Sequence, residues 1–251
     1  MPRIRSRLVT VPLTAVAAAL TLTAAVQAGA AEPSAEGGTG STSKAGAAAS
    51  APCLENATTL IGDIDGDGLP DRISNPGNDG TKMTVQFGIK GGSFDEKFTV
   101  AELVGANKGE ETTAAVADFQ NDGILDLVVN VIEPSGGDDP ATARIAEYRP
   151  GPLDRTDLSS DDTVKAGLGE RGEIWGLAVA DYNGDKLPDL AIHNNTGDGT
   201  AEREVRLGQP GTGIEDINYD DNAKYGEDNA TWGEPPAMPT DGWSKFYKAC
   251  A

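Results

Sequence analysis

One acidic motif occurs three times along the chain, and this repetition limits the possible folds more than any other feature. Residues 58–74 (TTLIGDIDGDGLPDRIS), 114–130 (AAVADFQNDGILDLVVN) and 177–193 (LAVADYNGDKLPDLAIH) each place aspartates at positions 1, 5 and 9 of a loop between two apolar runs. The first aspartates lie roughly 60 residues apart, a spacing typical of repeats that each form one supersecondary unit. The sequence therefore predicts a propeller-like or solenoid architecture.

Strands are expected on both sides of each acidic loop. Residues 127–129 are apolar at every position, as in a strand buried on both faces. Glycine-containing turns follow the loops, at Asn78-Asp79-Gly80, Gly136-Gly137 and Gly197-Asp198-Gly199. Each unit would thus form an antiparallel sheet of about four strands, the size of a propeller blade. We expect an all-β fold, a β-propeller-like array of three or four blades, with repeats at about 57–111, 112–174 and 175–230.

The acidic loops are predicted calcium sites. Calcium prefers about six to eight oxygen ligands, and a loop with acids at alternate positions directs its carboxylates toward one centre. Positions 1, 3, 5 and 9 would supply side chains and position 7 a backbone carbonyl. The predicted ligands are Asp63, Asp65, Asp67, Leu69, Asp71, Asp118, Gln120, Asp122, Ile124, Asp126, Asp181, Asn183, Asp185, Leu187 and Asp189. The alternative is that these loops are turns without a metal.

The three loops are not equivalent. The first has four carboxylates and is expected to be the strongest site, whereas position 3 is Gln120 in the second loop and Asn183 in the third. Lys186 takes a glycine position of the third loop, where it adds a positive charge and requires a left-handed backbone. An EF-hand is excluded, because position 12 is serine, valine or isoleucine instead of the bidentate glutamate.

The three segments, with the sequences VQFG at residues 85–88 and GGSF at residues 91–94, resemble FG-GAP/VCBS repeats. These repeats are the calcium-loop blades of integrin-like β-propellers and of many exported bacterial proteins. The resemblance covers about residues 57–215 and implies a β-propeller blade fold, with the Asp and Asn positions above as ligands. Gln120, Lys186 and the small repeat number depart from the pattern, because complete propellers have at least about four blades.

Three architectures remain open: an open arc of three blades, a small propeller completed by strands near Cys53 and Cys250, or an assembly of chains. A fourth acidic stretch at residues 216–220 has Lys224 at position 9 and is expected to be a loop.

The N-terminal residues predict export. Residues 1–30 combine Arg3, Arg5 and Arg7 with an uncharged apolar run and an Ala-Gly-Ala end, which is typical of a cleaved signal peptide. The alternative is an uncleaved membrane anchor. Residues 31–52 are rich in Ala, Gly, Ser and Thr and are expected to form a flexible linker, so the repeat domain is residues 53–251.

Cys53 and Cys250 are the only cysteines and stand at the two ends of the repeat domain. In an exported protein such a pair predicts one disulfide, which brings the ends of the domain together. The C-terminal aromatic residues are expected to close the core around it, although they could also contact a sugar or a protein partner; these are Trp232, Trp243, Phe246 and Tyr247.

The composition excludes several functions. A formal charge of −20 argues against binding to nucleic acid, which requires a basic surface. His193 is the only histidine and is expected to be structural or to lie on the surface, and no catalytic or cofactor-binding motif is recognisable.

We therefore expect a secreted calcium-binding module for binding or adhesion, in which Ca²⁺ has a structural role. Its partner would be an extracellular protein or a glycan, with a homo-oligomer as a further option and no membrane contact after signal removal. The alternatives are a carbohydrate-active extracellular hydrolase and a protease-inhibitor or toxin-assembly subunit.

Overall fold

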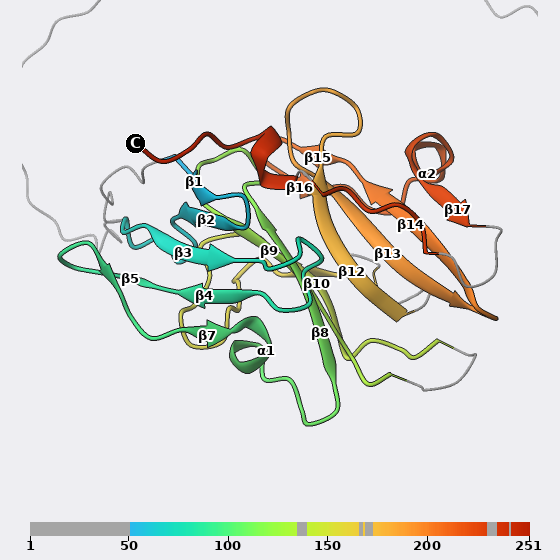
Figure 1. Ribbon diagram of the computed structural model, residues 1–251, viewed down its shortest axis with the longest axis horizontal. Coiled ribbons are helices and arrows are strands. Elements are labelled where there is room, and N and C mark those ends of the chain that lie inside the picture. The colour runs from blue at the N-terminus through green and yellow to red at the C-terminus, as the bar shows by residue number, and fades with distance from the viewer. Residues whose placement is uncertain (1–50, 135–139, 166–167, 169–172, 230–234, 241) are drawn as a thin grey trace, which may run out of the picture. The chain divides into compact units, whose positions relative to one another are not determined.

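The computed structural model describes residues 51–134, 140–165, 168, 173–229, 235–240 and 242–251. The predicted signal peptide, nearly all of the predicted linker, the turn at Gly136-Gly137 and Trp232 lie outside these residues. In the described part of the chain the fold is mostly β, arranged in several antiparallel sheets (Figure 1). This confirms the all-β expectation.

Three larger sheets follow one another along the chain, and each acidic loop joins two neighbouring strands of one sheet. The first sheet has the order β1-β2-β3-β4-β7, with β1 Cys53–Asn56, β2 Thr59–Gly62, β3 Asp71–Ser74, β4 Thr84–Gln86 and β7 Phe98–Thr99. The second has the order β11-β10-β9-β8, with β8 Glu111–Ala117, β9 Asp126–Ile132, β10 Ile145–Arg149 and β11 Val164–Lys165. The third has the order β12-β13-β14-β17, with β12 Glu173–Ala180, β13 Asp189–Gly197, β14 Thr200–Arg206 and β17 Glu227–Asn229.

Shorter elements connect and cover these sheets. Two small hairpins are formed by β5 Gly88–Ile89 with β6 Ser93–Phe94, and by β15 Gly208–Gln209 with β16 Gly213–Ile214. The helices are α1 Val100–Leu103, α2 Tyr219–Tyr225 and the 3₁₀-helix η1 Gly242–Lys245. No helix in the described part of the chain has the length and apolar composition needed to cross a bilayer.

The first sheet differs from the expected unit in two ways. It has five strands, because β1 pairs with β2 and extends the sheet beyond the repeat. The strand segment after the turn at Asn78-Asp79-Gly80 is divided into β4 and β5, since the Phe87 and Gly88 amides donate to the side chains of Asp95 and Asp71. The Gly88 amide therefore leaves the ladder to bind the acidic loop, and the Phe87 amide leaves it to bind Asp95.

The sequence predicts a loop at residues 216–220, but the structure shows that only the first part of this acidic stretch is a loop. It leads into α2, where the side chain of Asn218 caps the helix by accepting from the amides of Asp220 and Asp221. Acids in the first turn and Lys224 in the last complement the helix dipole. Helix formation therefore takes this stretch away from the pattern of the three repeated loops.

One core lies between the three larger sheets. Its fully buried residues include Leu60 of β2, Val128 of β9 and Leu190 of β13, and Val, Ile, Leu and Ala predominate throughout. All seven residues of β9 are buried, as expected for a strand that is apolar on both faces. The second acidic loop thus leads into a strand that is buried over its whole length.

The turn at residues 77–80 links all three larger sheets. It follows β3, yet the Asp79 carbonyl accepts a hydrogen bond from Leu177 of β12 at 3.0 Å, and the Gly80 carbonyl accepts one from Ala114 of β8 at 3.0 Å. Both β8 and β12 are edge strands whose amides need acceptors. The hairpin turn of the first sheet therefore supplies backbone acceptors to the edges of the other two.

The C-terminal residues return to the beginning of the domain. Cys53 and Cys250 form a disulfide with their Cα atoms 5.0 Å apart, as expected from their positions. Beside it, Leu54 of β1 forms a parallel bridge with Ala249. The indole of Trp243 donates to the Val116 carbonyl of β8 at 2.6 Å, and Trp243 is buried in the core. The tail therefore joins the first sheet to the second.

Candidate metal centre

The three acidic loops share one backbone conformation. Positions 4 and 6 are left-handed in every loop: Gly66 (φ +71°), Asn121 (+56°) and Gly184 (+80°) at position 4, and Gly68 (+82°), Gly123 (+91°) and Lys186 (+70°) at position 6. Lys186 thus adopts the left-handed conformation that its place in the repeat predicted. The shared curvature makes the loops three copies of one structure, whatever their side chains.

The aspartate at position 9 holds each loop closed. Asp71, Asp126 and Asp189 are fully buried at the start of β3, β9 and β13. One oxygen of each accepts from the amide at position 2, at 2.8, 2.8 and 2.7 Å. The other accepts from the amide of a glycine that follows later in the chain, at 2.7, 2.8 and 2.8 Å; these glycines are Gly88 at the start of β5, Gly151 after β10 and Gly208 at the start of β15. Each position-9 carboxylate therefore ties its loop to a segment that follows its own sheet in the chain.

Close contacts with neighbouring backbone leave room only for glycine at these three positions. A Cβ atom would lie 2.6 Å from the Pro70 carbonyl oxygen at Gly88, 2.6 Å from that of Leu125 at Gly151, and 2.2 Å from that of Pro188 at Gly208. Phe87-Gly88 and Leu207-Gly208 are visible in the sequence as glycines at strand ends. Their pairing with the position-9 aspartates depends on the fold and was not predicted.

The aspartates at positions 1 and 5 organise the middle of each loop. In the first loop, Asp63 accepts from the amides of Gly66 at 2.7 Å and Gly68 at 2.9 Å. Asp118 and Asp181 also accept from amides of their own loops. At position 5, Asp67, Asp122 and Asp185 accept from the position-7 amides of Leu69, Ile124 and Leu187. Backbone donors thus orient the carboxylates toward the inside of the loops.

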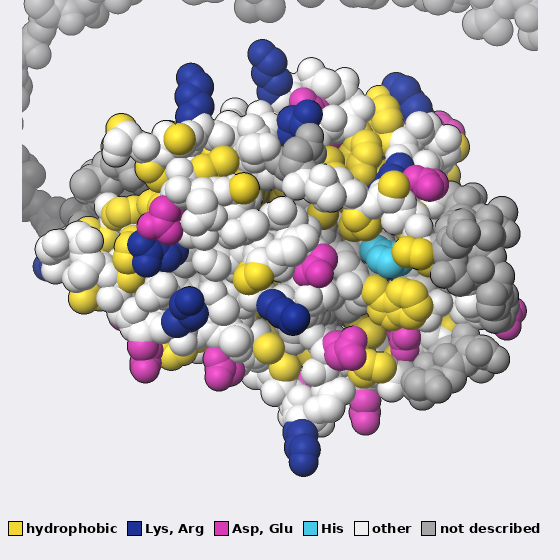
Figure 2. Space-filling view, viewed as in Figure 1, with side chains coloured by type: hydrophobic (Ala, Val, Ile, Leu, Met, Phe, Trp, Pro, Cys, Tyr) yellow, Lys and Arg dark blue, Asp and Glu magenta, His cyan; other side chains and the backbone are white. Residues whose placement is uncertain are grey.

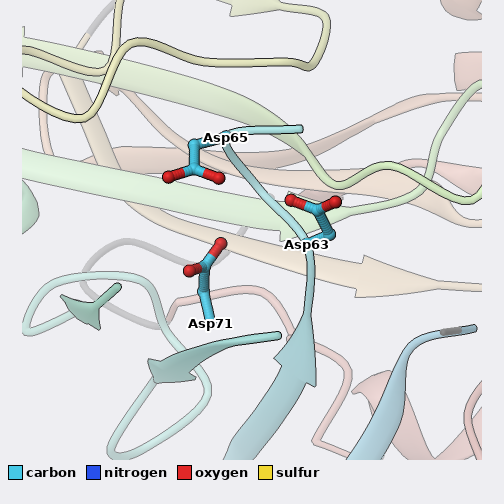
Figure 3. A group of neighbouring side chains, drawn as sticks. All are labelled: Asp63, Asp65 and Asp71. Carbon is cyan, nitrogen blue, oxygen red and sulfur yellow. The ribbon is translucent and has the colours of Figure 1, made fainter. Parts of the chain in front are cut away.

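Only the first loop brings three carboxylates together among the described residues. Oxygen atoms of Asp63, Asp65 and Asp71 all lie within 4.8 Å of one another. Figure 3 shows the carboxylates of Asp65 and Asp71 facing each other, with that of Asp63 beside them; Asp63 and Asp65 belong to the loop after β2, and Asp71 begins β3. Asp63 is 3% exposed, and Asp65 Oδ2 is buried and accepts no hydrogen bond. Such a cluster could hold a metal ion.

Burial raises the affinity of these carboxylates for protons. Desolvation raises the pKa of Asp71 to about 7 and that of Asp65 to about 6, against the opposing effect of backbone hydrogen bonds. In the other loops, desolvation likewise raises the pKa of Asp126 to about 7 and that of Asp189 to about 6. The folded loops therefore contain too little positive charge to offset the cost of burying these carboxylates.

A single arginine reaches the first loop from another part of the chain. Arg155 follows β10, and its Nε lies 3.3 Å from Asp65 Oδ2, without the geometry of a hydrogen bond. Its Nη1 lies 3.3 Å from Asp67 Oδ2, and its Nη2 lies 3.4 Å from Asp95 Oδ2. Sequence analysis missed Arg155 and Asp95, because nothing in their local sequence relates them to the loop.

The amides at position 3 do not reproduce Asp65. The Gln120 side chain extends toward the neighbouring β15–β16 hairpin, where its Nε2 donates to the Gly211 carbonyl at 3.5 Å. Asn183 donates to Asp185 at 2.8 Å within the third loop. The first loop therefore has the densest negative charge, as its sequence had indicated.

A comparison with protein-family models finds a match over residues 63–129, to the FG-GAP-like repeat. The match begins at Asp63, the first residue of the first acidic loop, and ends within β9, beyond the second loop. No curated protein and no solved structure matches the chain.

Proposed function

Because residues 63–129 of this chain are an FG-GAP-like repeat, we propose that it is a secreted β-propeller-like binding module stabilised by calcium. Its partner would be an extracellular protein or a glycan, and the calcium would have a structural role. The observation that carries this proposal is the convergence of three carboxylates in the first loop, with the buried Asp65 Oδ2 accepting no hydrogen bond.

The chemistry of the cluster favours calcium over other metals. Its side-chain donors are carboxylate oxygens, whereas zinc and copper sites usually contain histidine or cysteine. The single histidine is in β13, and both cysteines form the disulfide. Calcium tolerates irregular geometry and a mixed set of carboxylate and carbonyl ligands, which a curled loop of this length can provide.

The predicted ligands of the first loop are Asp63, Asp65, Asp67 and Asp71, with the carbonyl of Leu69. A bound Ca²⁺ would supply the positive charge that these crowded carboxylates lack. Asp71 connects the amides of Ile64 and Gly88, so its orientation is linked to the start of the loop and to the β5–β6 hairpin. Neutralising this group would therefore stabilise the junction between β2, β3 and the β5–β6 hairpin.

The second and third loops are proposed as weaker sites. Their ligands would be Asp118, Gln120, Asp122, Asp126 and the Ile124 carbonyl, and Asp181, Asn183, Asp185, Asp189 and the Leu187 carbonyl. The left-handed positions and the position-9 hydrogen bonds that they share with the first loop support this assignment. The amide side chains at position 3 contribute no charge, so lower affinity is expected.

We further propose that each larger sheet is one blade of a compact three-bladed unit. The shared acceptor turn at residues 77–80 and the disulfide between the domain ends support an arrangement that is completed within one chain. The disulfide also agrees with an oxidising, extracellular location.

Calcium titration by calorimetry, with thermal unfolding in calcium and in EDTA, tests the proposal. We expect binding at extracellular affinities, on the order of 10⁻⁴–10⁻³ M, and a lower melting temperature in EDTA. Asp63→Asn should remove the strongest binding event. Asp161→Asn, which changes an exposed acid outside the loops, should leave it intact. Equal melting temperatures in calcium and EDTA, with no heat of binding, would contradict the proposal.

A further inference from the structure

Arg155 is held beside the first loop by a rigid segment. The amide of Leu153 donates to the Ile64 carbonyl at 2.9 Å, and Leu153 and Leu158 are both buried. Between them, the amide of Leu158 donates to the Asp154 carbonyl at 2.8 Å. Gly66 also faces this segment, since a Cβ at that position would lie 2.6 Å from Pro152 Cβ. The backbone therefore fixes where the Arg155 side chain begins.

The guanidinium lies among several acceptors without pairing closely with any of them. Its nitrogens are 3.3–3.4 Å from oxygens of Asp65, Asp67 and Asp95, and Nη2 also donates to the Gly88 carbonyl at 3.3 Å. The group lies 4.9 Å from the centre of the Phe87 ring. By contrast, Arg144 is 2.6 Å from Glu110 in a conventional surface pair. Arg155 thus distributes one positive charge over the first loop and its neighbour Asp95.

This arrangement is specific to the first loop. Among the described residues, no ion pair joins an arginine or lysine to the acids of the second or third loop. The loop with the most carboxylates is thus also the one with an arginine from outside the loop. Two of the acids it contacts, Asp65 and Asp67, are proposed calcium ligands.

We propose that Arg155 is an internal counter-ion that competes with calcium at the first loop. This inference rests on the proposed calcium site. The guanidinium partly neutralises the loop when calcium is absent, and it repels the ion when calcium binds. Arg155 therefore sets the affinity of the first loop below the value that four carboxylates would give, and it limits how much stability the loop loses without calcium.

The test uses calcium calorimetry on the mature chain, in a background with Asp122→Asn and Asp185→Asn to weaken the other loops. Arg155→Gln should bind calcium about tenfold more tightly, the order of effect expected for removing one positive charge near a divalent ion in water. Arg155→Lys keeps the charge and should remain close to the unsubstituted protein. Arg144→Gln, the matched control, should bind with unchanged affinity.

Thermal unfolding distinguishes a counter-ion role of Arg155 from a role in packing alone. Arg155→Gln should lower the melting temperature in EDTA relative to the unsubstituted protein. Most of this decrease should disappear in saturating calcium. An equal loss in both conditions, or calcium affinity that is unchanged or weaker in Arg155→Gln, would overturn the inference while leaving the calcium site in place. Absence of calcium binding in every variant would overturn the proposed site and this inference together.

Discussion

At the scale of single residues, the residue type at position 6 distinguishes the third loop from the other two, although all three share the same backbone conformation. Lys186 has a φ of +70°, where the first and second loops have glycine. A left-handed conformation costs a residue with a side chain about 1–2 kcal/mol, and glycine adopts it freely. The loop keeps its shape despite this cost, which indicates that the surrounding strands determine it.

Lys186→Gly should therefore stabilise the protein, by about 0.5–1 kcal/mol after the greater flexibility of glycine in the unfolded chain is subtracted. It should also strengthen calcium binding at the third loop by removing a positive charge. The reciprocal change Gly123→Lys should destabilise by a similar amount, about 0.5–1 kcal/mol, because a Cβ there meets no atom within 4 Å and the cost comes from the backbone conformation. Urea unfolding of both variants measures these effects, and destabilisation by Lys186→Gly would contradict the argument.

At the scale of elements, the turn at residues 77–80 depends on contacts beyond its own hairpin, and the bulge in β12 redirects a side chain within its hairpin. The turn reaches β8 and β12 through the Asp79 and Gly80 carbonyls. In β12, the pairing shifts between Ile174 and Gly176, so Trp175 is an extra residue opposite β13. Such bulges redirect side chains, and here the Trp175 ring meets His193 edge-to-face at 5.5 Å. Figure 2 shows the single histidine, in cyan, beside hydrophobic side chains.

Gly80→Ala should disrupt the junction between the sheets. The new Cβ would lie 2.2 Å from the Ala114 carbonyl oxygen, and Gly80 has a φ of +79°. Overpacking and the left-handed conformation together should cost about 3 kcal/mol. Gly91→Ala is the matched control, because its φ is +106° but no atom lies within 4 Å of the new Cβ. Chemical unfolding should show the larger loss for Gly80→Ala, and equal losses would show that the contact with β8 is unimportant.

His193 should make folding stability depend on pH. Burial lowers its pKa below the ordinary value of 6.5, so the folded state favours the neutral imidazole. This contribution to stability is present above pH 6.5 and is lost as the pH falls through the lowered pKa. NMR of the single imidazole resonance measures the pKa directly. Trp175→Ala, which uncovers the ring, should return it toward 6.5, and a pKa at or above 6.5 in the unsubstituted protein would contradict the prediction.

At the scale of the whole molecule, the fold is completed by its C-terminal tail. The disulfide, the bridge between Leu54 and Ala249, and the Trp243 hydrogen bond attach residues near the C-terminus to β1 and β8. The two cysteines are separated by 197 positions, and Trp243 is separated from Val116 by 127. Formation of the domain therefore requires both ends of the repeat region.

Removal of the disulfide with Cys53→Ser and Cys250→Ser should lower the free energy of unfolding by about 2–5 kcal/mol. The stabilising effect arises mainly because the bond restricts the unfolded chain. Urea unfolding with and without dithiothreitol measures the change, and the double variant should be insensitive to the reductant. An unchanged midpoint on reduction of the unsubstituted protein would show that the tail contacts alone hold the ends together.

Much of the fold could be predicted from local sequence. The acidic loops, the strands beside them and the hairpin turn at Asn78-Asp79-Gly80 follow from short patterns of apolar residues, acids and glycines. The fifth strand of the first sheet and helix α2 were not predicted. β1 depends on pairing beyond the repeat, and α2 depends on the capping side chain of Asn218.

Local sequence also predicts the acids of the candidate site. The acids of the first loop were identified because their spacing places them on one curled segment, and Asp63, Asp65 and Asp71 do converge. Arg155 and Asp95 could not be identified, since only the folded chain brings them to the loop.

By itself, the sequence determined the repeated loop, because spacing along a short segment fixes which side chains a tight turn can bring together. It also determined the cysteine pairing, because only two cysteines are present. The tertiary structure alone decided which glycine amides satisfy the buried position-9 carboxylates, where the turn at residues 77–80 finds its partners, and which positive charge lies beside the first loop. These contacts join residues distant in the chain, and their geometry exists only after the three sheets have packed around a common core.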